Sequence, residues 1–291
     1  MKKISKLSLI SLFLLSLIFA GILSQQSIMA EMQESSYLKL ASWNIRILSN
    51  SRTDEDLRMI CNVAKKFDFI SVVELRDELV LKRLVAIMKN EFGKTYDYEV
   101  STPVGSATQK ELYAFLYDTS LLRVVTPGKI FEDTTFLRKP YYATFRSREF
   151  DFTVIVTHII WGNSVTERRK EINRLAIVYQ MIQDADPHEN DIILVGDYNR
   201  EPDDDLAWGP LRSLTGMINL FQLPEKSMIW DSNLYDNIWF QSHYVREYTL
   251  DRGIIHFDET DFGNDDKAAS KAVSDHRPVW ALFNTNGPDD D

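Results

Sequence analysis

Asp191-Ile-Ile-Leu-Val-Gly-Asp-Tyr-Asn199 places four consecutive aliphatic residues ahead of a glycine. A continuous aliphatic run of this length is typical of a strand buried on both faces, and the glycine gives the chain freedom to turn. Asp197 and Asn199 lie two residues apart, so their side chains point the same way in an extended chain. A carboxylate beside a carboxamide can bind a divalent cation or position a water molecule. Because Asp and Asn also favour turns, the alternative is a capped turn after a core strand.

The first 30 residues have the pattern of a secretory signal peptide. Three lysines precede an almost uninterrupted apolar run from Leu7 to Leu23, and small or polar residues follow up to Ala30. The run of 17 residues is at the short end for crossing a bilayer, so we expect cleavage rather than a membrane anchor. The sequence therefore predicts a secreted protein with a signal peptide at 1–30, a short lead at 31–36, one domain at 37–284 and a disordered acidic tail at 285–291.

Composition and charge limit the class of protein. The 291 residues are 44% hydrophobic and 26% charged, which is ordinary for a globular protein and sufficient for one large core. Removal of residues 1–30 takes away three lysines and no acidic residue, which leaves a net charge of −13. A strong basic field for nucleic acid is absent, although bound cations or a local basic ridge can offset a negative whole. Cys61 is the only cysteine, which excludes an intrachain disulfide, and its place on an apolar helical stripe predicts a core position.

Strand-like and helix-like segments alternate along the mature chain. Apolar runs predict strands at 38–45, 69–73, 112–117, 141–145, 150–157, 192–195 and 235–240. Apolar stripes predict helices after the acidic residues at 54–56, around 81–88, and after a capping box at 164–167. The basic residues of the last helix, Arg168, Arg169, Lys170 and Arg174, are expected to form a solvated face. The alternation indicates an α/β protein.

Polar side chains suited to chemistry recur where the apolar strands end. They are Asn44, Glu74, His158, Asp197 with Asn199, Asp236, and Asp275 with His276. A single residue of this kind usually caps a turn, but the whole set is hard to assign to turns. Carboxylates, amides and imidazoles at one edge of stacked sheets are what metal-assisted phosphoester hydrolysis requires: a cation, a general base and groups that stabilise charge on phosphorus.

Six segments resemble, in order, the motifs of the endonuclease/exonuclease/phosphatase superfamily. They are Trp43-Asn44-Ile45, Val73-Glu74-Leu75-Arg76-Asp77, Thr157-His158, Gly196-Asp197-Tyr198-Asn199, Tyr235-Asp236 and Ser274-Asp275-His276-Arg277-Pro278-Val279. The resemblance covers about residues 37–284 and implies a four-layered α/β sandwich, in which helices flank two central, mostly antiparallel β-sheets. Arg76 and the segment Gln109–Tyr117 are similar to the deoxyribonuclease I-like branch, which implies a divalent-metal-dependent DNA endonuclease with little sequence specificity, acting as a monomer.

The resemblance also implies a role for each site residue. Two imidazole–carboxylate pairs are expected, His158 with Asp236 and His276 with Glu111, each able to act as acid or base. Mg²⁺, or Mn²⁺ in its place, is expected on Glu74, with Asn44, Asp275 or Asp197 close to the cation. The remaining roles are phosphate binding by Asn44 and Asn199, insertion of Arg76 into a minor groove, and orientation or deprotonation of water by Asp197. Which of Asp197 and the histidines takes the proton stays open.

Some positions depart from the branch. Gln109 stands where a tyrosine usually packs against the sugar, so a different grip on duplex DNA is expected, and Arg138 is expected to contact phosphate instead. The branch's disulfide is absent. The acidic run at 203–205 offers carboxylates for a structural Ca²⁺, or is a plain acidic loop. The histidines outside every motif, His188, His243 and His256, are expected in loops or on the surface.

Two alternative functions fit the sequence in part. The first is a secreted, sphingomyelinase-like phosphodiesterase of the same fold, which acts on phospholipid head groups. The negative net charge of the mature chain fits this function equally well. Arg76 and the lack of an aromatic hairpin suited to membranes argue against it. A non-catalytic binding protein is expected to have lost site residues, whereas every expected one is present. The sequence therefore favours a secreted, Mg²⁺-dependent endonuclease acting on DNA.

Overall fold

The computed structural model describes residues 36–162, 164–186 and 188–287. The predicted signal peptide and residues 288–291 of the predicted tail lie outside this range, whereas Thr285, at the start of that tail, is buried. Contacts divide the chain into a short unit, Met1–Tyr37, and a compact unit, Leu38–Asp291. Within the described ranges, no helix combines the length and apolarity needed to cross a membrane.

Strands and helices alternate through the compact unit. The strands are β1 (Tyr37–Leu48), β2 (Phe69–Leu75), β3 (Tyr96–Val100), β4 (Val104–Gly105), β5 (Lys110–Asp118), β6 (Arg123–Ile130), β7 (Tyr141–Ser147), β8 (Phe150–His158), β9 (Ile192–Asp197), β10 (Met217–Asn219), β11 (Asp236–Gln241), β12 (Tyr248–Ile254) and β13 (Val279–Asn284). The helices are α2 (Asp54–Ala64), α3 (Leu79–Phe92), α4 (Val165–Ala185), α5 (Asp205–Arg212), α6 (Phe257–Thr260) and α7 (Asp266–Ala272).

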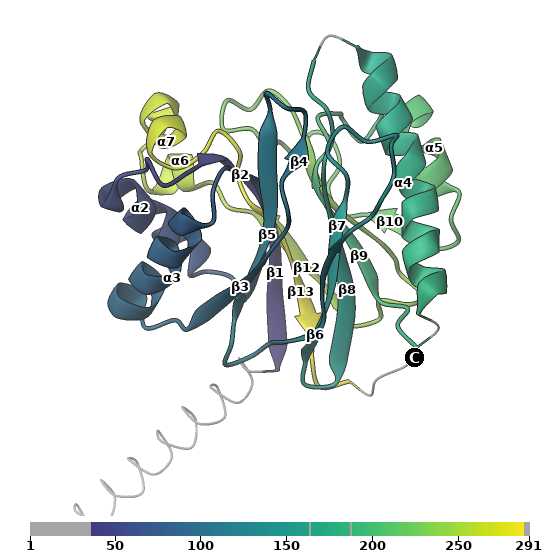
Figure 1. The fold of residues 1–291 in the computed structure, drawn as a ribbon, viewed down its shortest axis with the longest axis horizontal. Coiled ribbons are helices and arrows are strands. Elements are labelled where there is room, and N and C mark those ends of the chain that lie inside the picture. The colour runs from purple at the N-terminus through teal and green to yellow at the C-terminus, as the bar shows by residue number, and fades with distance from the viewer. Residues whose placement is uncertain (1–35, 163, 187, 288–291) are drawn as a thin grey trace, which may run out of the picture. The chain divides into compact units, whose positions relative to one another are not determined.

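Two mixed β-sheets lie face to face with helices on their outer sides (Figure 1). The first has the order β12-β13-β1-β2-β5-β3, with β4 paired to β5, and the second has the order β10-β11-β9-β8-β7-β6. β1 and β2 are parallel, as are β8 and β9, while β5 and β7 run antiparallel to their neighbours. Helices α2, α3, α6 and α7 cover the first sheet, and α4 and α5 cover the second (Figure 1). The predicted four-layered α/β sandwich is confirmed.

Three apolar layers hold the unit together. Aromatic residues fill the space between the sheets, where the Phe69 and Phe145 rings lie 4.9 Å apart, edge to face. A second layer packs α2 and α3 on the first sheet and contains Cys61, which is buried as expected. A third packs α4 and α5 on the second sheet, where Trp208 and Trp239 stack with ring centres 4.6 Å apart. Each sheet is thus buried on both faces, which explains the uninterrupted aliphatic run of β9.

Some elements were not predicted from the sequence. β3, β6, β10 and β12 end the order of their sheets, and edge strands carry a weak apolar pattern because one side faces solvent. β6 contains Pro127 and Gly128, which lower strand propensity. α5 contains Pro210 and Gly209, which are poor helix formers, so the region after β9 reads as a loop.

The acidic run at 203–205 is engaged in ion pairs with arginines. The Asp204 carboxylate accepts hydrogen bonds from Arg169 at 2.9 Å and from Arg200, and Asp205 accepts one from Arg212 at 2.6 Å. Burial favours the neutral acid, but the two guanidinium groups outweigh it and lower the pKa of Asp204. Arg169 forms an ion pair with Asp204, and Arg174 forms one with Asp133. The basic face of α4 is therefore only partly solvated.

We expect Asp204→Asn to lower the free energy of unfolding at neutral pH by about 1–3 kcal/mol, the range for hydrogen bonds to charged groups. A lowered native pKa stabilises the fold above the unfolded pKa, and this stabilisation is lost as the pH falls through the native pKa. Urea unfolding at several pH values should therefore show a deficit that shrinks below about pH 4. Asp203→Asn, at an exposed neighbour, is the matched control. A deficit that stays constant into the acid range would contradict the ion-pair account.

Candidate active site

A pocket of about 660 Å³ opens where strands of both sheets end. Ten predicted site residues line it: Glu74, Arg76, Gln109, Glu111, Arg138, His158, Asp197, Asn199, Asp275 and His276. The other two, Asn44 and Asp236, are buried behind the lining and form hydrogen bonds to it. The structure therefore brings all the predicted site residues to one place.

Strand register accounts for this convergence. In the second sheet, His158 of β8 and Asp236 of β11 both pair with Asp197 of β9, one from each side. In the first sheet, Asn44 of β1 pairs with Val73 of β2, so that Glu74 follows next to it. Paired residues on neighbouring strands lie side by side on the same face. The register therefore places the last residues of β8 and β9 beside the first residue of the antiparallel β11, and Glu74 near the end of β2 beside Asn44 of β1.

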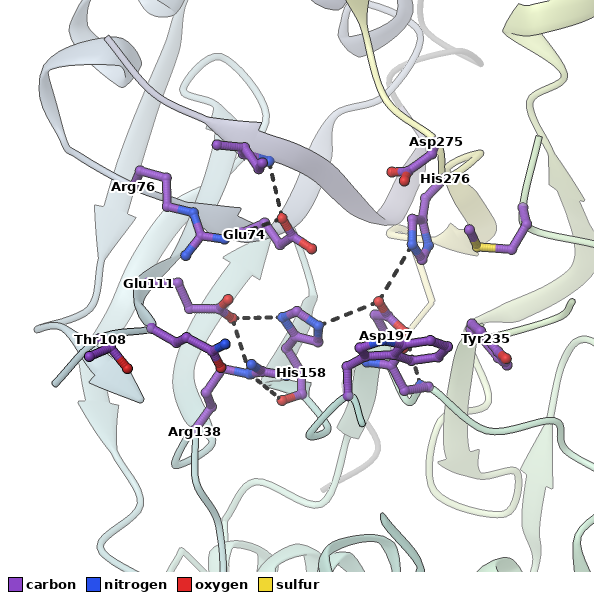
Figure 2. A pocket seen from close by; sticks show the side chains of 15 residues that line it. Glu74, Arg76, Thr108, Glu111, Arg138, His158, Asp197, Tyr235, Asp275 and His276 are labelled. Atoms are coloured by element: carbon purple, nitrogen blue, oxygen red, sulfur yellow. Dashed lines mark hydrogen bonds and ion pairs between the residues drawn. The ribbon is translucent and has the colours of Figure 1, made fainter. Parts of the chain in front are cut away.

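Local irregularities in the first sheet accompany the site. The β1–β2 register shifts between Asn44 and Leu48, and the β2–β5 register shifts between Val72 and Leu75. Within these segments Glu74 has φ +60°, in the left-handed region that few residues other than glycine adopt. Bulges of this kind redirect side chains and are common next to active sites. Here the bulge accompanies a Glu74 side chain that lies in the pocket (Figure 2).

Asp197 lies at the centre of the hydrogen-bond network. Its side chain is 2% exposed, and one oxygen, Oδ2, accepts a hydrogen bond from Asn44 at 3.0 Å. The same oxygen faces Nε2 of His158 at 3.5 Å and Nε2 of His276 at 3.6 Å. Oδ1 accepts from the backbone amide of Asn199 at 2.9 Å. Burial disfavours the charged form, but the two histidines and these donors together lower the pKa of Asp197, so it is a carboxylate.

The predicted histidine pairing is wrong. His158 Nδ1 lies 2.8 Å from Glu111 Oε1, and His276 Nδ1 lies 2.7 Å from Asp236 Oδ2. β9 lies between the strands that carry His158 and Asp236, about 10 Å apart, and each of these two residues is hydrogen-bonded to a partner from the other sheet or its loops. β1 and β2 likewise separate β5, which carries Glu111, from β13, which follows His276. Each observed pair instead joins residues from opposite sheets, and Figure 2 shows the row Glu111–His158–Asp197.

His276 is surrounded by carboxylates. Burial favours the neutral imidazole, but Asp236, Asp197 and Asp275 outweigh it and raise the pKa of His276 to about 10. Burial raises the pKa of Asp236, yet its hydrogen bond to a protonated imidazole favours the carboxylate, and we take the pair as an ion pair. Asp197, Asp236 and His276 could each offer a ligand atom to a cation, within 4.8 Å of one another. Because His276 Nδ1 lies 2.7 Å from Asp236 Oδ2, we interpret these two residues as a hydrogen-bonded pair, and His276 Nε2 faces Asp197 Oδ2 at 3.6 Å.

Glu74 and Asn44 suit a divalent cation better. Glu74 Oε1 accepts from Asn44 Nδ2 at 3.2 Å, and its side chain is 21% exposed to the pocket. Asn44 Oδ1 is buried and has no hydrogen-bond partner within the described part of the chain. A free buried carbonyl oxygen beside a carboxylate is the ligand chemistry that Mg²⁺ prefers. Asp275 lines the same pocket, and its Oδ2 lies 3.7 Å from Arg46 Nε.

The two predicted substrate-binding arginines, Arg138 and Arg76, already donate hydrogen bonds to backbone carbonyls. Arg138 is 7% exposed, and its Nε and Nη2 donate to the carbonyls of His158 and Ile159 at 2.8 and 2.7 Å. These contacts support the backbone around His158, so those two nitrogens are not available for the predicted phosphate contact. Arg76 Nη1 donates to the Lys110 carbonyl at 2.8 Å and its Nη2 lies 3.4 Å from Glu74.

Among the residues around the site that were not predicted, Glu171 and Trp161 bear most on its geometry. Glu171, 4% exposed on α4, accepts hydrogen bonds from the amides of Leu137 and Ile160 at 2.8 and 2.9 Å. An acidic residue next to Ile172 on the buried stripe of a helix was the signal in the sequence. Trp161 lines the pocket and is 64% exposed. Its signal was the position three residues after His158.

The chain is similar in sequence to known deoxyribonucleases. No protein-family model matches the chain. The chain is 31% identical over 268 residues to a deoxyribonuclease of Thioalkalivibrio sp. (strain K90mix), across 86% of this chain and 72% of the relative. It is 24% identical over 261 residues to deoxyribonuclease-1 of Bos taurus, across 83% of this chain and 90% of the relative.

Solved structures share the fold. D. rerio TDP2 complexed with a single-strand DNA product matches with a TM-score of 0.60 and 17% identity, across 86% of this chain and all of that chain. The endonuclease/exonuclease/phosphatase from Bacteroides vulgatus matches with a TM-score of 0.57 and 15% identity, across 85% and 98% of the two chains. From these likenesses, the sequence identity to deoxyribonucleases and the pocket described above, we conclude that the chain belongs to the deoxyribonuclease I-like branch of the endonuclease/exonuclease/phosphatase superfamily.

Proposed function

We propose that this chain is a divalent-metal-dependent endonuclease that hydrolyses the phosphodiester bonds of DNA with little sequence specificity. One observation carries the proposal: two imidazoles, each fixed at Nδ1 by its own carboxylate, direct Nε2 toward the same buried oxygen of Asp197 at 3.5 and 3.6 Å. A carboxylate fixes the tautomer of a histidine and raises its basicity. The relatives named deoxyribonuclease support DNA as the substrate.

The chain's residues supply proton transfer and orientation. A scissile phosphate in the pocket meets one imidazole on each side of Asp197, so one can take the proton of the attacking water while the other protonates the leaving oxygen. Asp197 remains ionised and orients both groups. Water attacks phosphorus in line, a P–O bond to it forms, and the P–O bond to the leaving oxygen breaks.

Glu74 and Asn44 would hold the divalent cation, Mg²⁺ or Mn²⁺, with Asp275 near it. The cation would supply electrostatic stabilisation of the charge that develops on the phosphate oxygens.

Contacts to phosphate position a nucleic acid without reading its sequence, which supports low sequence specificity. The signal-peptide pattern supports secretion, and we propose that the enzyme acts as a monomer. The basis for a structural Ca²⁺ at 203–205 is weak, because two of these carboxylates pair with arginines.

We expect the purified mature protein to nick supercoiled plasmid with Mg²⁺ or Mn²⁺, and EDTA to abolish nicking. Loss of a metal ligand forfeits several kcal/mol of charge stabilisation, so Glu74→Gln should lower kcat/KM about 100-fold or more. Glu55→Gln, in the exposed first turn of α2, is the matched control and should keep full activity. A parallel assay with sphingomyelin vesicles separates the alternative substrate. Nicking that survives EDTA, or cleavage of lipid without cleavage of DNA, would refute the proposal.

We also expect Glu111→Gln and Asp236→Asn to lower kcat about 100-fold or more with a smaller effect on KM. Each change removes the carboxylate that orients one imidazole, and positioned acid–base groups contribute about 10²–10⁴-fold. Steady-state nicking of plasmid gives both parameters, and Asp251→Asn, at an exposed site on β12, serves as the control. If either variant kept the wild-type kcat, the corresponding carboxylate would have no part in positioning a proton-transfer group.

A further inference from the structure

Trp161 presents a large aromatic surface at the edge of a polar pocket. Its side chain is 64% exposed, whereas Trp43, Trp208 and Trp239 are buried in the apolar layers. It lines the same pocket as His158 and Asp197. A tryptophan this exposed gains little from the core, and together with Tyr235, which lines the same pocket, it gives the polar pocket an aromatic edge suited to a ligand with an apolar face.

The backbone leading to Trp161 is anchored by buried polar side chains. The Ile159 carbonyl accepts hydrogen bonds from Asn199 Nδ2 at 2.8 Å and from Arg138 Nη2 at 2.7 Å. The Ile160 amide donates to Glu171 at 2.9 Å. These contacts fix the chain between the catalytic histidine and the indole. The backbone that carries the indole is therefore held close to the residues proposed to act on phosphate, and a pre-ordered backbone lowers the entropic cost of binding.

The surroundings of the indole suit a nucleobase with its phosphate. The Tyr235 ring, which also lines the pocket, lies 6.1 Å from the Trp161 ring, tilted by 56°. The guanidinium of Arg168 lies 5.7 Å from the Trp161 ring centre and donates to the Gly162 carbonyl. Aromatic faces combined with a cation beside them are how proteins bind unpaired bases, because every base has a face that stacks.

We propose that Trp161, flanked by Tyr235 and Arg168, is a stacking subsite for one unpaired nucleobase next to the scissile phosphate. This assignment rests on the proposed function and extends its substrate class to single-stranded DNA. In a duplex, the neighbouring base pairs cover both faces of each base, so an indole gains access only where a strand is unpaired. The subsite lies on the side of the pocket near Tyr235, opposite Thr108 (Figure 2).

The test compares one oligonucleotide sequence as a single strand and as a duplex, with Mg²⁺. We expect Trp161→Ala to lower kcat/KM for the single strand about 5- to 150-fold, the range that stacking of one base provides, and to leave the duplex almost unchanged. Trp161→Phe should restore most of the loss, because it keeps a ring. Trp230→Ala, at a tryptophan that is 51% exposed and does not line the pocket, is the matched control. A single strand with abasic nucleotides beside the cleavage site should bring the wild-type enzyme down to the level of Trp161→Ala.

A binding measurement separates this proposal from the proposed function. In the Glu74→Gln background, adding the single strand should quench tryptophan emission, and Trp161→Phe should remove most of the quench. A quench that depends on Trp161 without any cleavage by the wild-type chain would keep the subsite and reject the nuclease. The subsite would be rejected if Trp161→Ala lowered kcat/KM equally for the single strand and the duplex, or did not lower it at all. It would also be rejected if Trp161→Phe left the quench of tryptophan emission unchanged.

Discussion

The site depends on one buried carboxylate that several donors share. A charged group out of water costs several kcal/mol unless donors and opposite charges replace its hydration. Asp197 receives that replacement from a carboxamide, a backbone amide and two imidazoles, which come from different strands and loops. Because each donor is also fixed by another partner, the carboxylate organises the pocket instead of collapsing onto a single counter-charge.

Three hydrogen bonds of the site run from one sheet to the other. Asn44 to Asp197, His158 to Glu111, and His276 to Asp236 each join a residue of the first sheet, or of the loop before its strand β13, to a residue of the second. The apolar layer between the sheets sets the separation that these bonds require. Phe69, Phe145 and their aromatic neighbours therefore act on the geometry of the site, and one of these neighbours, Tyr113, accepts a hydrogen bond from the His158 amide at 3.2 Å.

The sequence predicted which residues gather, but not how they pair. The aliphatic run 192–195 and the polar residues after each strand were sufficient to predict a common site, because parallel strands and matching registers bring their ends together. The order of strands within each sheet is a long-range property, and without it the histidines were assigned partners from their own sheet. Edge strands such as β6 and β12 were missed because solvent exposure weakens their apolar pattern. The role of Glu171 was missed because the sequence does not show that the backbone amides of Leu137 and Ile160 donate hydrogen bonds to it.

The division of the site between two sheets has a consequence for folding. Neither sheet by itself holds both members of an imidazole–carboxylate pair, and the lone cysteine offers no covalent link between them. A fragment, or a folding intermediate in which only one sheet has formed, therefore lacks a proton-transfer group with a fixed tautomer. Catalytic competence appears only when the two sheets dock, so it reports on the contact between the sheets and not on secondary structure alone.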